Sequence, residues 1–376
     1  MAFDRNLGVL MLRALVLIVI ALSVAACARP GPATLSLVAP AQGTKEISVL
    51  VATDRIPDPS DRGFSSGKSD RLHYRQVIVS VPPNHKVTEI EWPTAKPNAS
   101  NSFAVIKTRE LTADEFLKLA QQVRPRAPVA PGVGMFIHGY NYTYQEALFR
   151  LVQMSVDAGQ SQTSVLFDWP SQGALTGYIA DRDAVAYARD DLVKVLQSLG
   201  RGGVNTTLLA HSMGGLLTME TLRQLKITGN DRDLQMIDQV VLAAPDIDID
   251  LFRRDVVTIG RLKKPIMVLA AKDDRALALS RRLSGTTAAG ALDVSDPAVQ
   301  ALAKSDNLQI IDISSLKSIT STNHDRFVSF AAAYPQLQRA NSGQSNPLAG
   351  AGALVLNGVG NVISAPFRIT GAVLSQ

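Results

Sequence analysis

The chain has 376 residues, of which 46% are hydrophobic, 19% are charged and 5% are aromatic. This composition is typical of a globular protein and excludes an intrinsically disordered chain, which would be less apolar and more highly charged. The formal charge of +5 is small for this length, and no dense run of Lys and Arg is interleaved with aromatic residues, so nucleic-acid binding is not expected.

The N-terminus has the pattern of an export signal. Arg5 and Arg13 precede an uncharged apolar stretch that runs from Ala14 to Ala26. As a helix this stretch would span about 20 Å, which is shorter than the roughly 30 Å hydrocarbon core of a bilayer. A basic head followed by a short apolar stretch is typical of a secretory signal peptide, so we predict one over residues 1–26.

The predicted signal peptide is followed by the single cysteine of the chain, in the sequence VAAC at residues 24–27. This sequence resembles the lipobox of bacterial lipoproteins, in which the cysteine becomes the lipid-bearing first residue of the mature protein. The alternative is an ordinary signal peptide, which leaves Cys27 without a purpose because a lone cysteine cannot form an internal disulfide. We therefore predict acyl chains on Cys27 that anchor the protein in a membrane of the bacterial cell envelope. Because Ala28 and not aspartate follows the cysteine, this would be the outer membrane, facing the periplasm, in a Gram-negative source.

Eight segments that are rich in β-branched residues and bounded by turn residues are predicted to be strands. They are 46–54, 74–82, 134–139, 164–170, 206–211, 239–245, 266–271 and 308–314. Several are continuous apolar runs, which is the pattern of strands buried on both faces of a parallel sheet. Helical segments alternate with strands from about residue 134. The sequence therefore predicts an α/β fold with a mostly parallel central sheet of about eight strands and helices on both faces.

The predicted strands and helices define one α/β domain over residues 46–340. Residues 27–45 have the composition of a short tether between the anchor and this domain. The segment 275–304 is long for a plain crossover and is expected to add helices near the mouth of the site. Residues 341–376 are rich in Gly, Ala, Ser and Asn and are predicted to form a tail outside the domain.

The stretch LLAHSMGG at residues 208–215 joins a predicted strand to a predicted helix. A serine on such a sharp turn exposes its hydroxyl above the carboxyl edge of the sheet. The turn needs small residues two positions before and after the serine, here Ala210 and Gly214. The usual residue at the first position is glycine, and the methyl of Ala210 adds some crowding. A serine that only caps the helix would not explain these small neighbours, so we predict that Ser212 is a nucleophile.

A serine nucleophile needs a base, and His324 is the candidate among the five histidines. It follows the last predicted strand in a polar loop, from which an imidazole can reach the strand edge; the alternative is an ordinary surface histidine. The base in turn needs a carboxylate to orient it. Asp274, just after the strand 266–271, is predicted to be that acid, with Asp246 and Asp273 as alternatives.

The fourth expected part of the site is an oxyanion hole, a pair of backbone N–H groups that stabilise the charge of a tetrahedral intermediate. The sequence FIHGYN at residues 136–141 ends the strand before the first long helix. Its His-Gly pair is placed to present a backbone N–H across from the serine, although a plain tight turn is the alternative. We assign the two donors to the amides of Tyr140 and Met213. In FDWPSQG, at the end of the next strand, Trp169 is expected to pack in the core and Ser171 to lie at the rim.

These residues carry a resemblance to a known superfamily. The order nucleophile, acid, histidine, here Ser212, Asp274 and His324, is that of α/β-hydrolases. Over about residues 46–335 the chain resembles this superfamily, specifically a bacterial group of uncharacterised esterase- and lipase-like members. Seven fragments in order carry the resemblance: VLVATDR, YRQVIVSVPPNHKVTEIEWP, MFIHGYN, LFDWPSQG, LLAHSMGG, LAAPDID and AAKDDRAL. The resemblance implies the α/β-hydrolase fold and leaves the substrate open, because a fold does not fix a substrate.

Together these features predict a lipid-anchored serine hydrolase. Ser212 is expected to attack a carbonyl group, His324 to transfer the proton and Asp274 to hold the imidazole. A carboxylic ester, in a small molecule or a lipid, is the expected substrate because an alkoxide leaves more easily than an amine. No cofactor is expected, and the sequence has no Cys/His cluster of the kind that holds a metal. The alternatives are a catalytically silent envelope protein that uses the fold for binding, and a peptidase or thioesterase.

Overall fold

The structure is a computed structural model that describes residues 29–60, 62–122, 132–159, 164–297, 299–300, 303, 308–341, 355–356 and 362–363. The predicted signal peptide, the predicted lipidation site Cys27 and most of the predicted C-terminal tail lie outside these residues. Among the helices that are described, none combines the length and the apolar character needed to cross a membrane.

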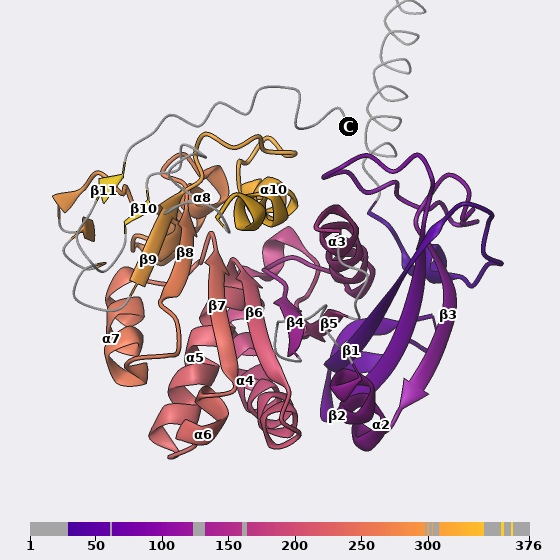
Figure 1. The fold of residues 1–376 in the computed structure, drawn as a ribbon, viewed down its shortest axis with the longest axis horizontal. Coiled ribbons are helices and arrows are strands. Elements are labelled where there is room, and N and C mark those ends of the chain that lie inside the picture. The colour runs from indigo at the N-terminus through magenta and orange to yellow at the C-terminus, as the bar shows by residue number, and fades with distance from the viewer. Residues whose placement is uncertain are drawn as a thin grey trace, which may run out of the picture.

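One mixed sheet forms the centre of the described chain (Figure 1). Its strands are β1 (Lys45–Pro57), β2 (Phe64–Val81), β3 (Ala104–Leu111), β4 (Gly132–Ile137), β5 (Ser164–Asp168), β6 (Asn205–His211), β7 (Ile237–Ala243), β8 (Ile266–Ala270), β9 (Leu308–Asp312), β10 (Val355–Leu356) and β11 (Val362–Ile363). The order across the sheet is β11-β10-β9-β8-β7-β6-β4-β5-β1-β2-β3. Neighbours from β9 to β1 are parallel, whereas the pairings at both edges are antiparallel.

The α/β-hydrolase fold class predicted from the sequence is confirmed, and all eight predicted segments are strands, namely β1, β2 and β4 to β9. The prediction missed β3 and the two-residue strands β10 and β11. In β3, whose sequence is AVIKTREL, three apolar residues are followed by a run of four polar or charged residues, which are partly or fully exposed. It therefore lacks the continuous apolar run that marks the central strands.

Helices cover both faces of the sheet (Figure 1). They are α2 (Ala113–Gln121), α3 (Tyr144–Asp157), α4 (Tyr178–Arg201), α5 (Met213–Ile227), α6 (Asp231–Leu234), α7 (Ile249–Ile259), α8 (Arg275–Ser284) and α10 (Arg326–Asn341), with short 3₁₀ turns η1 (Pro32–Leu35), η2 (Leu175–Gly177) and η3 (Ala289–Ala291). Apolar side chains of α2, α4, α5 and α7 share one core with the sheet, and those of α3 and α10 share the other. The segment 275–304 contributes α8 and η3, as expected.

The winding of the sheet reverses at β4. This strand lies between β5 and β6, although the chain passes through the three in the order β4, β5, β6. The connecting helices α3 and α4 consequently pack on opposite faces. In open α/β sheets, ligand sites form at such a switch point, outside the carboxyl ends of the strands. The fold thus brings the ends of β4 and β6 to the edge where a site is expected.

The described part of the predicted tether packs on the domain. The turn η1 buries Thr34 and Leu35, and Leu35 belongs to the same core as α3. The N–H of Val38 donates to the carbonyl oxygen of Val105 in β3, at 3.1 Å. The sequence predicts a short tether here, and the described part of it packs on the domain through a few apolar side chains. From residue 29 onward this segment is therefore part of the domain.

Asp54, in β1, carries a buried carboxyl group. The side chain is fully buried, and neither of its oxygens has a hydrogen-bond partner within the described structure. Burial, reinforced by the nearby charge of Asp191, raises the pKa of Asp54 from 3.8 to about 8. The carboxyl is therefore protonated in the folded protein at neutral pH, whereas it is ionised in the unfolded chain.

Folding consequently takes up a proton at Asp54 between about pH 4 and about pH 8. Because the folded state binds more protons in this window, the free energy of unfolding falls as pH rises, by up to about 1.4 kcal/mol per pH unit. Asp54→Asn keeps the shape of the neutral acid and removes this slope, so its stability relative to the parent should increase from pH 5 to pH 8. Urea unfolding at both pH values measures this, with the exposed Asp183→Asn as control. If the free energies of unfolding of Asp54→Asn and the parent differ by the same amount at pH 5 and pH 8, the pKa of Asp54 is not raised.

Candidate active site

Ser212 occupies the sharp turn between β6 and α5. Its backbone angles are φ 53° and ψ −122°, and a positive φ is uncommon outside glycine. Two hydrogen bonds hold this turn: the N–H of Ser212 donates to Ala243 O at 2.9 Å, and the N–H of Asp246 donates to Ser212 O at 3.2 Å. Backbone strain that is held in place by its surroundings is common at active sites. A serine on a strained strand-to-helix turn is the arrangement called a nucleophile elbow.

The turn at Ser212 packs directly against the loop that follows β4. A Cβ atom on Gly214 would lie 2.2 Å from the carbonyl oxygen of His138, and one on Gly139 would lie 2.9 Å from the Cβ of Ser212. Glycine at both positions is what allows the two backbones to approach so closely. Ala210, the other small residue of the motif, is fully buried in β6, so its methyl group is accommodated.

The two amides predicted to form an oxyanion hole lie on either side of this contact. Met213 is the first residue of α5, where N–H groups have no partner within the helix and the helix dipole favours negative charge. Tyr140 follows Gly139 in the loop after β4. Both amides therefore belong to the two segments that meet at Ser212, which is the arrangement that an oxyanion hole requires.

The fold brings Asp274 and His324 together from opposite ends of the segment that contains β9. Nδ1 of His324 lies 2.7 Å from Oδ2 of Asp274. Asp274 is also the N-cap of α8, and its Oδ1 accepts a hydrogen bond from the N–H of Leu277 at 3.0 Å. The carboxylate is buried and held at both oxygens, so its orientation toward the imidazole is fixed. With Nδ1 on the carboxylate, Nε2 is the nitrogen left to act on a hydroxyl group.

The two alternative acids have other partners. Asp273 is about half exposed and pairs with the guanidinium of Arg326, with 2.8 Å between Oδ2 and Nη2. Its hydrogen bonds to Arg326 lower the pKa of Asp273. Asp246 is buried and accepts hydrogen bonds from two hydroxyl groups, at 2.6 and 3.0 Å. Of the three acids, Asp274 is thus the one whose carboxylate contacts an imidazole.

His211 has a contact that the sequence analysis did not foresee. Its Nε2 lies 3.2 Å from the carbonyl oxygen of His324, and its ring stacks on Phe327 with 4.4 Å between centroids. Burial, together with the nearby His324, lowers the pKa of His211 well below 6.5, so the ring is neutral and donates its Nε2–H to that carbonyl. This bond ties the loop of His324 to the residue next to Ser212. The adjacent His-Ser pair in LLAHSMGG is the one sequence signal that could have suggested it.

Ser171 and Asp181 hold the loop after β4. Asp181, in the first turn of α4, accepts hydrogen bonds from the N–H of Asn141 at 3.2 Å and from the hydroxyl of Ser171 at 2.6 Å. The hydroxyl oxygen of Ser171 in turn accepts from the N–H of Tyr142 at 3.2 Å. Ser171 is fully buried, so the prediction that it lies at the rim is wrong. The reason is that the backbone N–H groups of this loop are turned inward and need buried acceptors.

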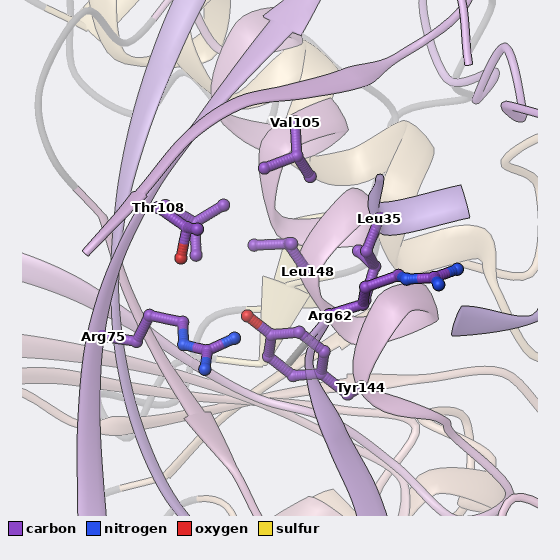
Figure 2. Close-up of a pocket in the computed structure, with 8 residues that line it drawn as sticks. Leu35, Arg62, Arg75, Val105, Thr108, Tyr144 and Leu148 are labelled. Atoms are coloured by element: carbon purple, nitrogen blue, oxygen red, sulfur yellow. The ribbon is translucent and has the colours of Figure 1, made fainter. Parts of the chain in front are cut away.

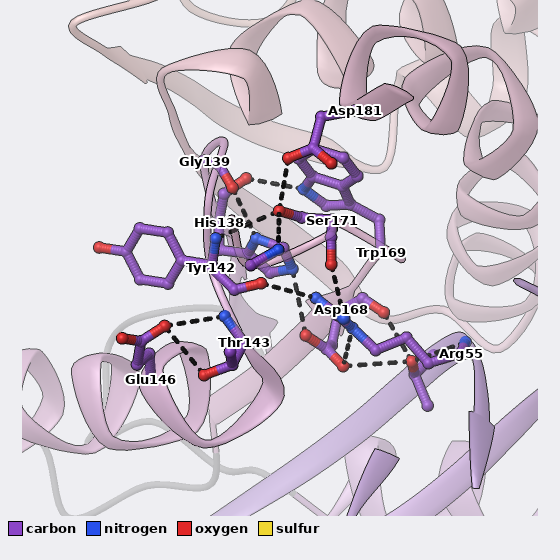
Figure 3. A network of polar contacts seen from close by, with 12 residues as sticks. Arg55, His138, Gly139, Tyr142, Thr143, Glu146, Asp168, Trp169, Ser171 and Asp181 are labelled. Atoms are coloured by element: carbon purple, nitrogen blue, oxygen red, sulfur yellow. Dashed lines mark hydrogen bonds and ion pairs between the residues drawn. The ribbon is translucent and has the colours of Figure 1, made fainter. Parts of the chain in front are cut away.

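Figure 3 shows that these contacts continue into a buried network around His138, Asp168 and Arg55. The side chain of His138 is fully buried, with its Nε2 3.1 Å from Oδ1 of Asp168, and its ring stacks on Trp169 at 5.0 Å between centroids. Asp168 also pairs with Arg55, at 2.9 Å. Trp169 Nε1–H donates to the carbonyl oxygen of His138 at 2.8 Å. The predicted core position of Trp169 is therefore confirmed, and the side chain of His138 supports the loop from below.

The described structure has a small internal cavity and a larger surface groove, and neither is lined by Ser212, Asp274 or His324. Figure 2 shows a cavity of about 40 Å³, lined by Arg75, Thr108 and Tyr144 among others. It has room for a few water molecules at most and includes none of the predicted site residues. A groove of about 680 Å³ lies between η2, the start of α4 and the end of α8, and its lining includes Tyr178 and Asp248.

The contact between the two backbones predicts a steric requirement at Gly214. Gly214→Ala would place a methyl group against main-chain carbonyls that cannot turn aside, so it should lower the free energy of unfolding by about 3 kcal/mol. Gly134→Ala is the matched control, because nothing lies within 4 Å of a Cβ atom there; it should change stability by less than about 1 kcal/mol. Urea unfolding of both variants is the measurement. Equal effects of the two substitutions would rule out the close approach.

Residues 120–341 match the model of a known protein family, described as an alpha/beta hydrolase of unknown function (DUF900). The match covers more than half of the chain and contains every strand from β4 to β9, together with Ser212, Asp274 and His324. No curated protein matches the chain.

Proposed function

We propose that this chain, which belongs to that alpha/beta hydrolase family of unknown function, is a serine hydrolase that cleaves carboxylic esters. The observation that carries the proposal is the 2.7 Å contact between Asp274 and His324, in a fold that also holds Ser212 on a strained turn. The hydrogen bond from His211, the neighbour of Ser212, to the backbone of His324 supports the same assignment, because it ties the loop of the proposed base to the residue next to the proposed nucleophile.

The proposed reaction has two stages. In the first, Oγ of Ser212 bonds to the carbonyl carbon while its proton passes to Nε2 of His324, and the imidazolium is stabilised by Asp274. The amides of Tyr140 and Met213 stabilise the oxyanion. The C–O bond to the alcohol then breaks, the leaving alkoxide takes the proton from His324, and the acyl group remains on Ser212. In the second stage, water attacks the acyl carbon while its proton passes to Nε2 of His324. The C–O bond to Ser212 then breaks, His324 returns the proton to Oγ of Ser212, and the carboxylic acid leaves.

The same proposal includes a location. Acyl chains on Cys27 would hold the enzyme in a membrane of the bacterial cell envelope, with the domain on the periplasmic side if that membrane is the Gram-negative outer membrane. The support for this is the VAAC sequence after a basic and apolar leader. An ester in a small molecule or a lipid remains the favoured substrate, since an alkoxide is a better leaving group than an amine.

An activated serine should react with a fluorophosphonate probe. The full-length protein, extracted in detergent from a bacterial host, should be labelled at Ser212, because His324 raises the nucleophilicity of its hydroxyl. Ser212→Ala should abolish the labelling, whereas Ser100→Ala, which removes an exposed loop serine, should leave it unchanged. Peptide mass spectrometry locates the adduct. A folded protein that is not labelled at Ser212 would contradict the proposal.

Substitution of the three acids should separate their roles. Asp274→Asn keeps a good N-cap for α8 but removes the negative charge next to His324, so kcat/KM for a p-nitrophenyl ester should fall by roughly 10⁴-fold. Asp273→Asn breaks an ion pair whose carboxylate is half exposed and points away from the imidazole, so its effect on kcat/KM should stay below about tenfold. Asp246→Asn should behave similarly. A larger loss at Asp273 or Asp246 than at Asp274 would show that the acid is wrongly assigned.

A further inference from the structure

The groove between η2, α4 and α8 has an apolar rim. Leu175, Ile179 and Leu283 line it and are 80%, 76% and 63% exposed. Leu279, one turn before Leu283 on α8, is 56% exposed. Large apolar side chains that gather on one surface mark a place where a soluble domain contacts a partner or a membrane.

Basic side chains accompany this apolar rim. Arg281 and Arg282 are exposed in the last turn of α8, beside Leu283. A helix that combines exposed leucines with arginines is suited to a membrane surface, because the leucines enter the interfacial region and the arginines meet anionic headgroups. In Figure 1, α8 lies at the same end of the sheet as α10, away from α6 and α2.

The groove adjoins the proposed active site. Tyr178 lies in its lining, and the hydroxyl of Tyr178 donates to Asp246 at 3.0 Å. The amide of Asp246 in turn donates to the carbonyl oxygen of Ser212. The ring of Tyr178 also packs edge-on against that of Tyr140, with 5.5 Å between centroids. Through Tyr178 the groove is therefore linked by direct contacts to Asp246, which lies next to Ser212, and to Tyr140, in the loop after β4.

Arg29 docks the N-terminal segment beside this groove. Its guanidinium donates to the side-chain and main-chain oxygens of Asn141, to the carbonyl of Gly173 and to Glu146. Asn141 follows Tyr140, and Gly173 lies two residues before Leu175 on the rim of the groove. Position 27 is two residues before Arg29, so the chain can separate their Cα atoms by no more than about 7 Å. A lipid on Cys27 would therefore leave the protein close to the rim.

We propose that Arg29 fixes the lipid-bearing end of the chain beside the groove, so that the apolar rim of η2, α4 and α8 rests on the bilayer. This inference depends on the proposed acylation of Cys27, and its meaning for catalysis depends on the proposed hydrolase function. We choose the bilayer as the occupant because Arg29 contacts Gly173, two residues before Leu175 on the rim, so the proposed anchor would hold that part of the rim near the membrane. With this orientation the site opens toward the membrane, and esters carried in the lipid layer reach it directly.

The test measures the depth of single positions in a bilayer. Acylated Cys27 has no free thiol, so one introduced cysteine can carry an environment-sensitive fluorophore. Ile179→Cys and Leu283→Cys report on the rim, and Ile227→Cys, an exposed apolar position at the end of α5, is the matched control. The full-length proteins are reconstituted in vesicles of phosphatidylcholine and phosphatidylglycerol that contain spin-labelled lipid. Quenching at 179 and 283 should exceed that at 227 several-fold.

A second comparison tests the role of Arg29. Arg29→Ala should reduce quenching at the two rim positions toward that at position 227, whereas Arg232→Ala, which removes an exposed arginine on α6, should not. Intact mass reports whether Cys27 is acylated in each sample, and fluorophosphonate labelling reports whether the hydrolase site is active.

Each result has a distinct meaning. Equal quenching at all three positions in an acylated protein overturns the proposal, as does an unmodified Cys27. Energy transfer between labelled copies without lipid quenching would assign the rim to a second copy of the chain instead. Rim quenching that survives Arg29→Ala overturns the role of Arg29. Loss of fluorophosphonate labelling with rim quenching intact would instead overturn the hydrolase function and leave the membrane contact standing.

Discussion

The close approach of the loop after β4 to the turn at Ser212 is the constraint on which the site depends. The reversal of winding at β4 brings the two segments to the same edge, and glycines at positions 139 and 214 let their backbones touch. Oxyanion donors act at about 2.7–3.1 Å from the charge that they stabilise, and a misplacement of about 1 Å can lower a rate by about 10²-fold. In the proposed mechanism, the amides of Tyr140 and Met213 would therefore share one oxyanion only while this contact stays closed.

Buried polar groups beneath the loop maintain the contact. Arg55, in β1, pairs with Asp168 and also donates to the carbonyls of Tyr142 and Ser171, so one guanidinium joins the segments that follow β4 and β5. Burying such an ion pair contributes little net stability, because desolvation offsets the attraction, but removing one partner leaves a buried charge and costs about 3–5 kcal/mol. We therefore interpret this network as a device that selects one loop conformation and contributes little to overall stability.

The features that were predicted from the sequence are those with a local signal. The central strands are apolar runs, and the turn at Ser212 is marked by small residues at fixed spacing. Asp274 was favoured over Asp273 by its distance from the end of β8, and the structure gives the physical reason: as the N-cap of α8 its carboxylate points inward to His324, whereas Asp273 points outward to Arg326. The burial of Ser171 and the docking of residues 29 onward have no local signal. Both depend on partners distant in sequence, such as Val105 for Val38.

The contacts of Arg29 also show how a weak interaction can orient a whole domain. Its side chain is partly exposed, so each of its pairings contributes only about 0–1 kcal/mol. Arg29 and its partners belong to one chain, so the docked and undocked states compete within one molecule at a high effective concentration. With the proposed anchor two residues away, this competition would also set the orientation of the domain on the membrane. In such a competition about 1.4 kcal/mol is a tenfold preference. Several weak bonds to Asn141, Glu146 and Gly173 are thus sufficient to favour one orientation, and they act on the same loop that carries Tyr140. In the proposed arrangement, one side chain would therefore couple the membrane anchor to the loop that carries Tyr140.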